Sequence, residues 1–157
     1  MTEESAKILQ RLMALCSRGE KCSSEARQYM LKHGATDEEA DLAVEYLTEN
    51  LYIDDHRFAR AYAADKFRFN KWGRDKITMQ LKIKKIPQEA IENAIEEIFD
   101  CDQEKETISN ELAKKLRGIK NDPKNKIWEK LMRFSISRGY SMQVARPIID
   151  QMIRELQ

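Results

Sequence analysis

The amino-acid sequence predicts an all-α protein built from three tandem three-helix repeats in an elongated array, straight or curved. Apolar residues recur at helical spacing along the chain, as in Ile8, Leu12 and Leu15. No segment shows the strict alternation of apolar and polar residues that marks a half-buried strand. The pattern also repeats with a period of about 50 residues, which is typical of repeat architectures.

Capping residues predict where the helices start, because their side-chain oxygens accept hydrogen bonds from the unpaired N–H groups of a first turn. Thr36 and Glu39 form a capping box, and Asp54 precedes another helix. The other expected caps are Ser23, Ser141 and Asp122, the last followed by Pro123 in the first turn. The predicted helices cover residues 5–18, 24–33, 37–50, 55–69, 74–84, 88–99, 103–117, 124–138 and 142–155.

These helices fall into three sets of three. A shift of 51 residues places Ala26 on Ile77, and a further shift of 54 places Ile77 on Leu131. The predicted repeats therefore cover residues 1–50, 51–100 and 101–157. A three-helix unit of this size buries little apolar surface alone, so we expect the repeats to pack against their neighbours.

Composition bears on location and redox state. The chain has neither the basic and apolar start of a signal peptide nor an apolar run long enough for a membrane span, so we expect a cytoplasmic protein. Its three cysteines match no usual zinc spacing and are expected to be reduced thiols. We expect a monomer that does not bind membranes.

Charge is distributed unevenly, although the net charge is only +1. Residues 1–50 carry 6 Lys or Arg and 10 Asp or Glu, whereas residues 56–86 carry 10 and 2. Residues 101–157 carry 12 and 8, which is a mild basic excess. Contacts with nucleic acid or with an acidic protein are therefore expected in the middle of the chain.

The stretch from Lys66 to Lys76 interleaves cations with aromatic residues around a turn between two helices. Such a pattern suits phosphates, carboxylates or stacked bases. Phe67 and Phe69 are more expected in the core, although residues two apart cannot both face one side of a helix. The candidate binding residues of this region are Arg57, Arg60, Lys66, Arg68, Lys71, Trp72, Arg74, Lys76 and Lys82.

The third repeat carries a weaker candidate surface. Arg138 and Tyr140 flank its second turn and are included in the candidate binding site. The other basic residues here are Lys124, Lys126, Lys130 and Arg133, for which a merely solvated helix is an equal alternative.

Catalysis has little support in the sequence. Asp54 and Asp55 form an adjacent acidic pair that could suggest Mg²⁺ binding or acid–base chemistry, with His56 beside them. Helix capping and the helix dipole already account for both acids. Since the chain also lacks a glycine-rich phosphate loop and a Cys-x-x-Cys pair, we expect no enzyme activity, no metal and no cofactor.

The segment from Tyr52 to Tyr62, followed by Lys71 to Ile77 and Leu81, resembles the central repeat of the RecX family. The resemblance covers essentially the whole chain and implies a small bacterial regulator made of three tandem three-helix repeats. It further implies a protein that lodges in the groove of the RecA recombinase filament on DNA. There it would limit filament growth, ATP hydrolysis and strand exchange, and so modulate recombination, DNA repair and the SOS response.

Two residues depart from the family pattern. Lys85 occupies a turn that usually carries glycine, so it must close the preceding helix in a less favourable conformation or by another geometry. Ser135 stands where the third repeat usually places a large apolar residue.

Two partners remain open at this point. The basic residues can contact the recombinase, or they can contact the single- or double-stranded DNA within its filament. The alternative function is a stand-alone DNA-binding module that presents the cations of residues 68–76 to phosphates.

Overall fold

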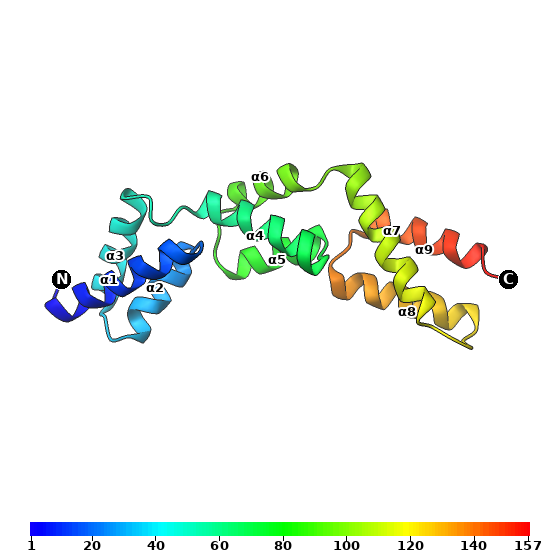
Figure 1. Cartoon of the computed structure of the whole chain (residues 1–157), viewed down its shortest axis with the longest axis horizontal. Coiled ribbons are helices and arrows are strands. Elements are labelled where there is room, and N and C mark those ends of the chain that lie inside the picture. Colours follow the sequence, from blue (N-terminus) through cyan, green and yellow to red (C-terminus); the bar gives the residue numbers. More distant parts are fainter. The chain divides into compact units, whose positions relative to one another are not determined.

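A computed structural model describes residues 1–157 and contains nine α-helices and no strand (Figure 1). Every predicted helix is present, and no predicted end differs from the observed one by more than two residues. The all-α fold of tandem three-helix repeats is therefore confirmed. The helices are α1 (Glu3–Arg18), α2 (Ser23–Lys32), α3 (Asp37–Glu49), α4 (Asp55–Asn70), α5 (Arg74–Ile83), α6 (Gln88–Ile98), α7 (Cys101–Arg117), α8 (Lys124–Arg138) and α9 (Met142–Arg154).

Capping hydrogen bonds explain why the starts of several helices were predictable. The Thr36 hydroxyl accepts from the Glu39 N–H at 3.2 Å, and the Glu39 carboxylate accepts from the Thr36 N–H at 3.0 Å. Asp54 accepts from the backbone N–H groups of His56 and Arg57, and these bonds lower the pKa of its carboxyl.

Two predicted caps are wrong by one position. The residues that precede α2 and α8 are Cys22 and Pro123, in place of Ser23 and Asp122. The Asp122 carboxylate instead pairs with the Lys130 ammonium at 2.5 Å. Asp122 therefore links the loop before α8 to a side chain of that helix.

The second helix of each repeat ends in the same turn, at Gly34, Lys85 and Gly139. In each turn this residue has a positive φ, of 107°, 60° and 77° respectively. The N–H of the following residue donates to the carbonyl five positions earlier, in Met30, Leu81 and Ser135, which is the Schellman arrangement. The turns are 51 and 54 residues apart, so they follow the spacing that the sequence predicts.

The structure shows how the chain accommodates the two residues that depart from the family pattern, Lys85 and Ser135. Lys85 closes α5 in the left-handed conformation, as the sequence predicts for a residue in place of glycine. Ser135 is fully buried, and its hydroxyl has no hydrogen-bond partner. The residue after its turn is the large, buried Tyr140, whereas the equivalent residue of the first repeat is Ala35, beside the large Met30. In the third repeat, therefore, the small Ser135 takes the place of Met30 and the large Tyr140 takes the place of Ala35.

The chain divides into two compact units. The first comprises Met1–Tyr62 and Leu81–Ala94, and the second comprises Ala63–Gln80 and Ile95–Gln157. The largest fully buried side chains of the first unit are Leu12, Met30, Leu47, Ile53, Leu81 and Ile91. Those of the second unit are Ile77, Ile108, Leu112, Leu131, Tyr140 and Ile149. The division falls within α4, α5 and α6, and the repeat boundaries at residues 50 and 100 stay a prediction.

Three further findings concern the whole chain. All three cysteines are free thiols, as expected. No helix has the length and apolar character that crossing a membrane requires. No group of three or more His, Cys, Asp or Glu side chains is placed to hold a metal ion.

Candidate binding site

The turn between α4 and α5 places two candidate lysines at the aromatic ring of a third candidate residue, Trp72. Lys71 directly follows α4 and has a φ of 58°. The Trp72 N–H donates to the Lys66 carbonyl at 3.1 Å. The ammonium groups of Lys66 and Lys76 lie 4.8 and 4.4 Å from the centre of the Trp72 ring. Cations at these distances are attracted to the ring face, so the half-buried Trp72 holds both lysines at the turn.

The same turn packs against the second turn of the third repeat, backbone against backbone. The Gly73 N–H donates to the Arg138 carbonyl at 2.7 Å, and the Asp75 N–H donates to the Gly139 carbonyl at 3.0 Å. We call this pairing of residues 71–76 with residues 137–140 the glycine joint. Side chains close it further: the Tyr140 hydroxyl donates to the Lys71 carbonyl at 2.8 Å, and the Lys76 ammonium donates to the Ser137 carbonyl at 3.2 Å.

Both glycines are required by this close approach. A Cβ on Gly73 would lie 2.3 Å from the Gly139 carbonyl oxygen, and a Cβ on Gly139 would lie 2.2 Å from the Lys76 Cβ. Atoms do not approach so closely, and backbone atoms cannot move aside as a flexible side chain can. The glycine joint is therefore a rigid contact within the second unit.

Three of the predicted arginines are held by carboxylates of the same unit. Arg74 forms a bidentate pair with the buried Glu104, at 2.9 and 2.7 Å. Arg138 pairs with Glu111 at 3.2 Å, and Arg57 pairs with Glu20 at 2.8 Å. The hydrogen bonds that Arg74 donates to Glu104 are the main reason that the pKa of Arg74 is raised. These guanidinium groups support the fold, and their part in partner binding stays a prediction.

Tyr140 is also a structural residue. Its side chain is 2% exposed, and burial raises the pKa of its hydroxyl to about 12. Its ring contacts Phe134 edge-on, with the ring centres 6.3 Å apart. A partner cannot reach this side chain in the conformation described.

Three candidate cations are exposed: Arg60, Arg68 and Lys82. Arg68, in the last turn of α4, has no hydrogen bond or ion pair within the chain. Beside it the expectation for Phe69 was wrong, because this side chain is 79% exposed whereas Phe67 is 6% exposed. Two aromatics two positions apart face different sides of a helix, so the sequence indicates that one of the two is exposed. It does not indicate which one, because cations lie next to both residues.

The first unit has a contact at the position that corresponds to the glycine joint, but this contact is made by side chains and not by paired backbone groups. The Ser24 hydroxyl donates to the Lys84 carbonyl at 2.5 Å, and the Lys84 ammonium pairs with Glu25 at 3.1 Å. Lys84 also lies within 6 Å of the ring centres of Phe58 and Tyr62, at 5.9 and 5.8 Å. We call this contact of residues 22–25 with Lys84 the serine joint. Shifted by 51 and 54 residues, it corresponds to the glycine joint.

The acidic cluster at the start of α4 is likewise explained by structure. Asp54 caps α4, and the Asp55 carboxylate accepts a hydrogen bond from the Ser23 N–H at 2.8 Å. Asp55 therefore ties α4 to the start of α2. The sequence had assigned Asp55 only to the helix dipole, since a partner 32 residues away leaves no local signal.

Comparison with known proteins gives these features a context. Residues 54–95 match the family model described as RecX, second three-helix domain. The regulatory protein RecX of Clostridium tetani (strain Massachusetts / E88) is 31% identical over 126 residues, which are 79% of this chain and 57% of that protein. The regulatory protein RecX of Prosthecochloris aestuarii (strain DSM 271 / SK 413) is 25% identical over 150 residues, covering 96% of both chains.

Solved structures show the same fold. The crystal structure of RecX from Lactobacillus salivarius superposes with a TM-score of 0.82 at 16% identity, over 99% of this chain and all of that one. A second crystal structure of regulatory protein RecX gives a TM-score of 0.84 at 22% identity, over 94% of this chain and 72% of that one. The chain spans only 57% and 62% of the length of the relatives from Clostridium tetani and Clostridium botulinum (strain Eklund 17B / Type B).

Proposed function

Because the chain belongs to the RecX family, we propose that it binds RecA recombinase filaments on DNA and inhibits filament growth, ATP hydrolysis and strand exchange. In this role it modulates homologous recombination and DNA repair. The named relatives are regulatory proteins and not enzymes, which supports a role that depends on binding alone.

The observation that carries the proposal is the exposed pair of Arg68 and Phe69 at the end of α4. Aromatic side chains and arginine are both enriched at protein interfaces, and arginine is among the residues that contribute most of the binding energy there. The glycine joint holds the turn that follows this pair, so the pair is presented from a rigid element. Preorganised contacts lose less entropy on binding than flexible ones do.

The test is the DNA-dependent ATP hydrolysis of RecA recombinase on single-stranded DNA, measured with increasing amounts of the protein. The unaltered protein should inhibit hydrolysis. The double variant Arg68→Glu with Phe69→Ala should need about tenfold or more protein for the same inhibition, as expected for two central interface residues. Its helical content and thermal unfolding should stay unchanged, since neither side chain is buried.

A matched control makes the same kinds of substitution, a cation to glutamate and an apolar residue to alanine, on another surface of the protein. Lys7 and Leu42 are an exposed cation and an exposed apolar residue of the first repeat, so Lys7→Glu with Leu42→Ala should inhibit like the unaltered protein. No inhibition by the unaltered protein would rule out the proposed function. Equal inhibition by both double variants would place the binding face elsewhere.

The alternative of a DNA-binding module centred on residues 68–76 is not our proposal. Such a module would present the cations of the turn to phosphates. Here Arg74 is occupied by Glu104 and Lys76 by the Ser137 carbonyl, so two of those cations have internal partners.

A further inference from the structure

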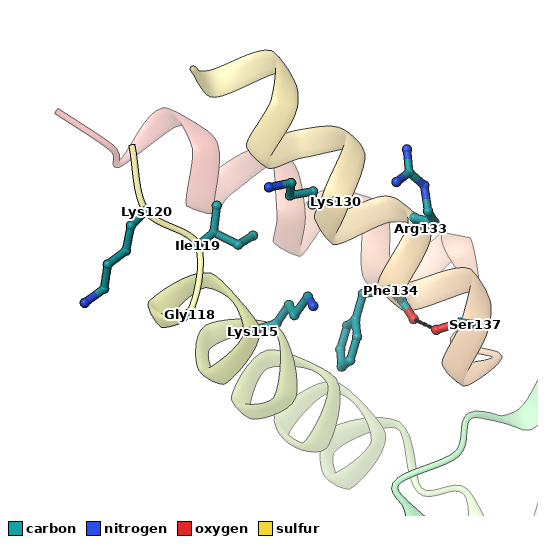
Figure 2. Close-up of a pocket in the computed structure, with 8 residues that line it drawn as sticks. All are labelled: Lys115, Gly118, Ile119, Lys120, Lys130, Arg133, Phe134 and Ser137. Atoms are coloured by element: carbon teal, nitrogen blue, oxygen red, sulfur yellow. Dashed lines mark hydrogen bonds between the residues drawn. The ribbon is translucent and has the colours of Figure 1, made fainter. Parts of the chain in front are cut away.

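A hollow within the second unit lies between α7 and α8 and is separate from the candidate binding site. It is an open groove of about 780 Å³, lined by the end of α7, the loop after it and one face of α8. Figure 2 shows Lys115, Ile119, Lys130 and Phe134 directed into the space between the two helices. Lys120 and Arg133 lie at the rim of the groove, and their charged ends point outward.

The lining of this groove is cationic. Four of its eight residues are Lys or Arg, and none is Asp or Glu. The surrounding segment, residues 112–138, carries nine Lys or Arg and two Asp or Glu, whereas the chain as a whole has a net charge of +1. Asp122 neutralises Lys130, but Lys120 and Arg133 are exposed and have no carboxylate partner. An anionic ligand is the one that such a lining attracts.

The groove also has an aromatic wall. Phe134 is half-buried, and its ring projects between α7 and α8 (Figure 2). The Arg138 guanidinium lies 4.7 Å from the centre of the ring, and the exposed Lys115 ammonium lies 5.7 Å from it. Arg138 is fixed by its pair with Glu111, whereas Lys115 has no ion pair and can swing aside. A flat group that enters the groove can therefore replace Lys115 at the ring.

We propose that this groove of the third repeat binds a single nucleic-acid strand, with backbone phosphates at Lys115 and Arg133 and a base against Phe134. Positive grooves that carry an aromatic side chain bind single strands in this way, because every base has a face that can stack. The guanidinium of Arg133 suits phosphate oxygens, which it can bind with two parallel hydrogen bonds. The proposal goes beyond the proposed function, since it needs no recombinase.

An acidic peptide is the competing ligand, and the lining favours it less. A peptide that docks in a groove relies on apolar pockets or on backbone hydrogen bonds for much of its affinity. This groove offers Ile119 and Phe134 as its only large apolar residues. Its one hydroxyl, on Ser137, already donates to the Phe134 carbonyl at 2.7 Å.

The experiment titrates a fluorescein-labelled thymidine 20-mer with the purified protein alone, at several salt concentrations between 20 and 200 mM. The double variant Lys115→Ala with Arg133→Ala should bind at least about tenfold more weakly at low salt. Its affinity should also depend less steeply on salt, by about 1.4 in the slope of log K against log salt, since each lost phosphate contact contributes about 0.7 for a single strand.

The control variant is Arg117→Ala with Lys124→Ala. It removes the same charge from two exposed residues of the same repeat that do not line the groove. It should retain most of the affinity. If both double variants bind equally, the affinity comes from the general field of the repeat and the groove proposal is wrong.

A third measurement tests the aromatic wall. The protein should bind the thymidine 20-mer more tightly than an abasic strand of the same length. Phe134→Leu should lose that preference while still unfolding in a cooperative thermal transition, which shows that the variant is folded. On isotope-labelled protein, the amide signals of Gly118, Ile119 and Ser137 should shift during the titration. Equal binding of both strands by the unaltered protein, equal competition by polyglutamate, or unshifted amides would each contradict the proposal.

Discussion

At the scale of single residues, the glycine joint depends on Gly73 having no side chain. Gly73→Ala places a Cβ 2.3 Å from a backbone oxygen, so we expect it to lower the free energy of unfolding by about 1–3 kcal/mol. Gly19→Ala is the matched control, because Gly19 has an extended backbone and no atom within 4 Å of the added Cβ. Gly19→Ala should leave the free energy of unfolding unchanged or raise it by up to about 1 kcal/mol, because alanine reduces the conformational entropy of the unfolded chain. Urea unfolding followed by circular dichroism measures both, and equal effects would contradict the steric argument.

Tyr140 makes the stability of the protein sensitive to alkaline pH. Its pKa is about 12 in the folded protein, against an ordinary value of 10.0, so the folded state holds the hydroxyl proton more tightly than the unfolded state does. The stabilisation is therefore fully present below pH 10 and is lost as the pH rises from 10 to 12. Two pKa units correspond to about 2–3 kcal/mol.

Tyr140→Phe separates this effect from the titration of lysines. The variant should be less stable by about 1 kcal/mol near pH 7, because it loses the hydrogen bond to the Lys71 carbonyl. Above pH 10 its unfolding free energy should fall less steeply than that of the unaltered protein. Urea unfolding at pH 7, 9.5 and 11 measures the difference, and parallel pH profiles for the two proteins would refute the assignment to Tyr140.

At the scale of elements, the end of α5 carries a strain that the ends of α2 and α8 avoid. All three helices end in the same turn, but Lys85 adopts its positive φ with a Cβ, where the other two have glycine. Lys85→Gly should stabilise the protein by about 0.5–1 kcal/mol, since relief of left-handed strain exceeds the greater flexibility of glycine in the unfolded chain. Lys85→Ala removes the same charge and keeps the Cβ, so it should give no gain. A gain from alanine as large as that from glycine would assign the effect to charge.

Elements were predictable where their signals are local. The capping box of α3 and the turn at Lys85 were predictable because each depends on residues within a few positions of each other. The pairs of Arg74 with Glu104 and Asp55 with Ser23 join residues 30 and 32 positions apart, and helical periodicity carries no information about them. For this reason the sequence identified the basic residues of the candidate site without separating the arginines that hold the fold from the exposed Arg68.

At the scale of the whole molecule, internal pairing lowers the available positive charge of both basic regions. In residues 56–86, Arg57, Arg74 and Lys84 are each paired with a carboxylate, whereas Arg68 is exposed and unpaired. In the third repeat four cations are paired, which are Lys114, Lys126, Lys130 and Arg138, whereas Lys120 and Arg133 are exposed and have no such partner. Our two proposals assign different partners to these regions: the recombinase to Arg68 and Phe69, and a nucleic-acid strand to the groove between α7 and α8.

The division into compact units predicts that the third repeat does not fold alone. The second unit joins residues 63–80 to residues 95–157, and the glycine joint and the Arg74–Glu104 pair both cross the predicted boundary at residue 100. A fragment of residues 101–157 leaves the buried carboxylate of Glu104 without its guanidinium, and breaking such a pair is strongly destabilising. So small a fragment also has little core to compensate. We expect it to show low helicity and no cooperative urea transition, whereas residues 51–157, which contain the whole second unit, should unfold cooperatively. A cooperative transition of the short fragment, with the same midpoint as the long one, would show that the repeats fold independently.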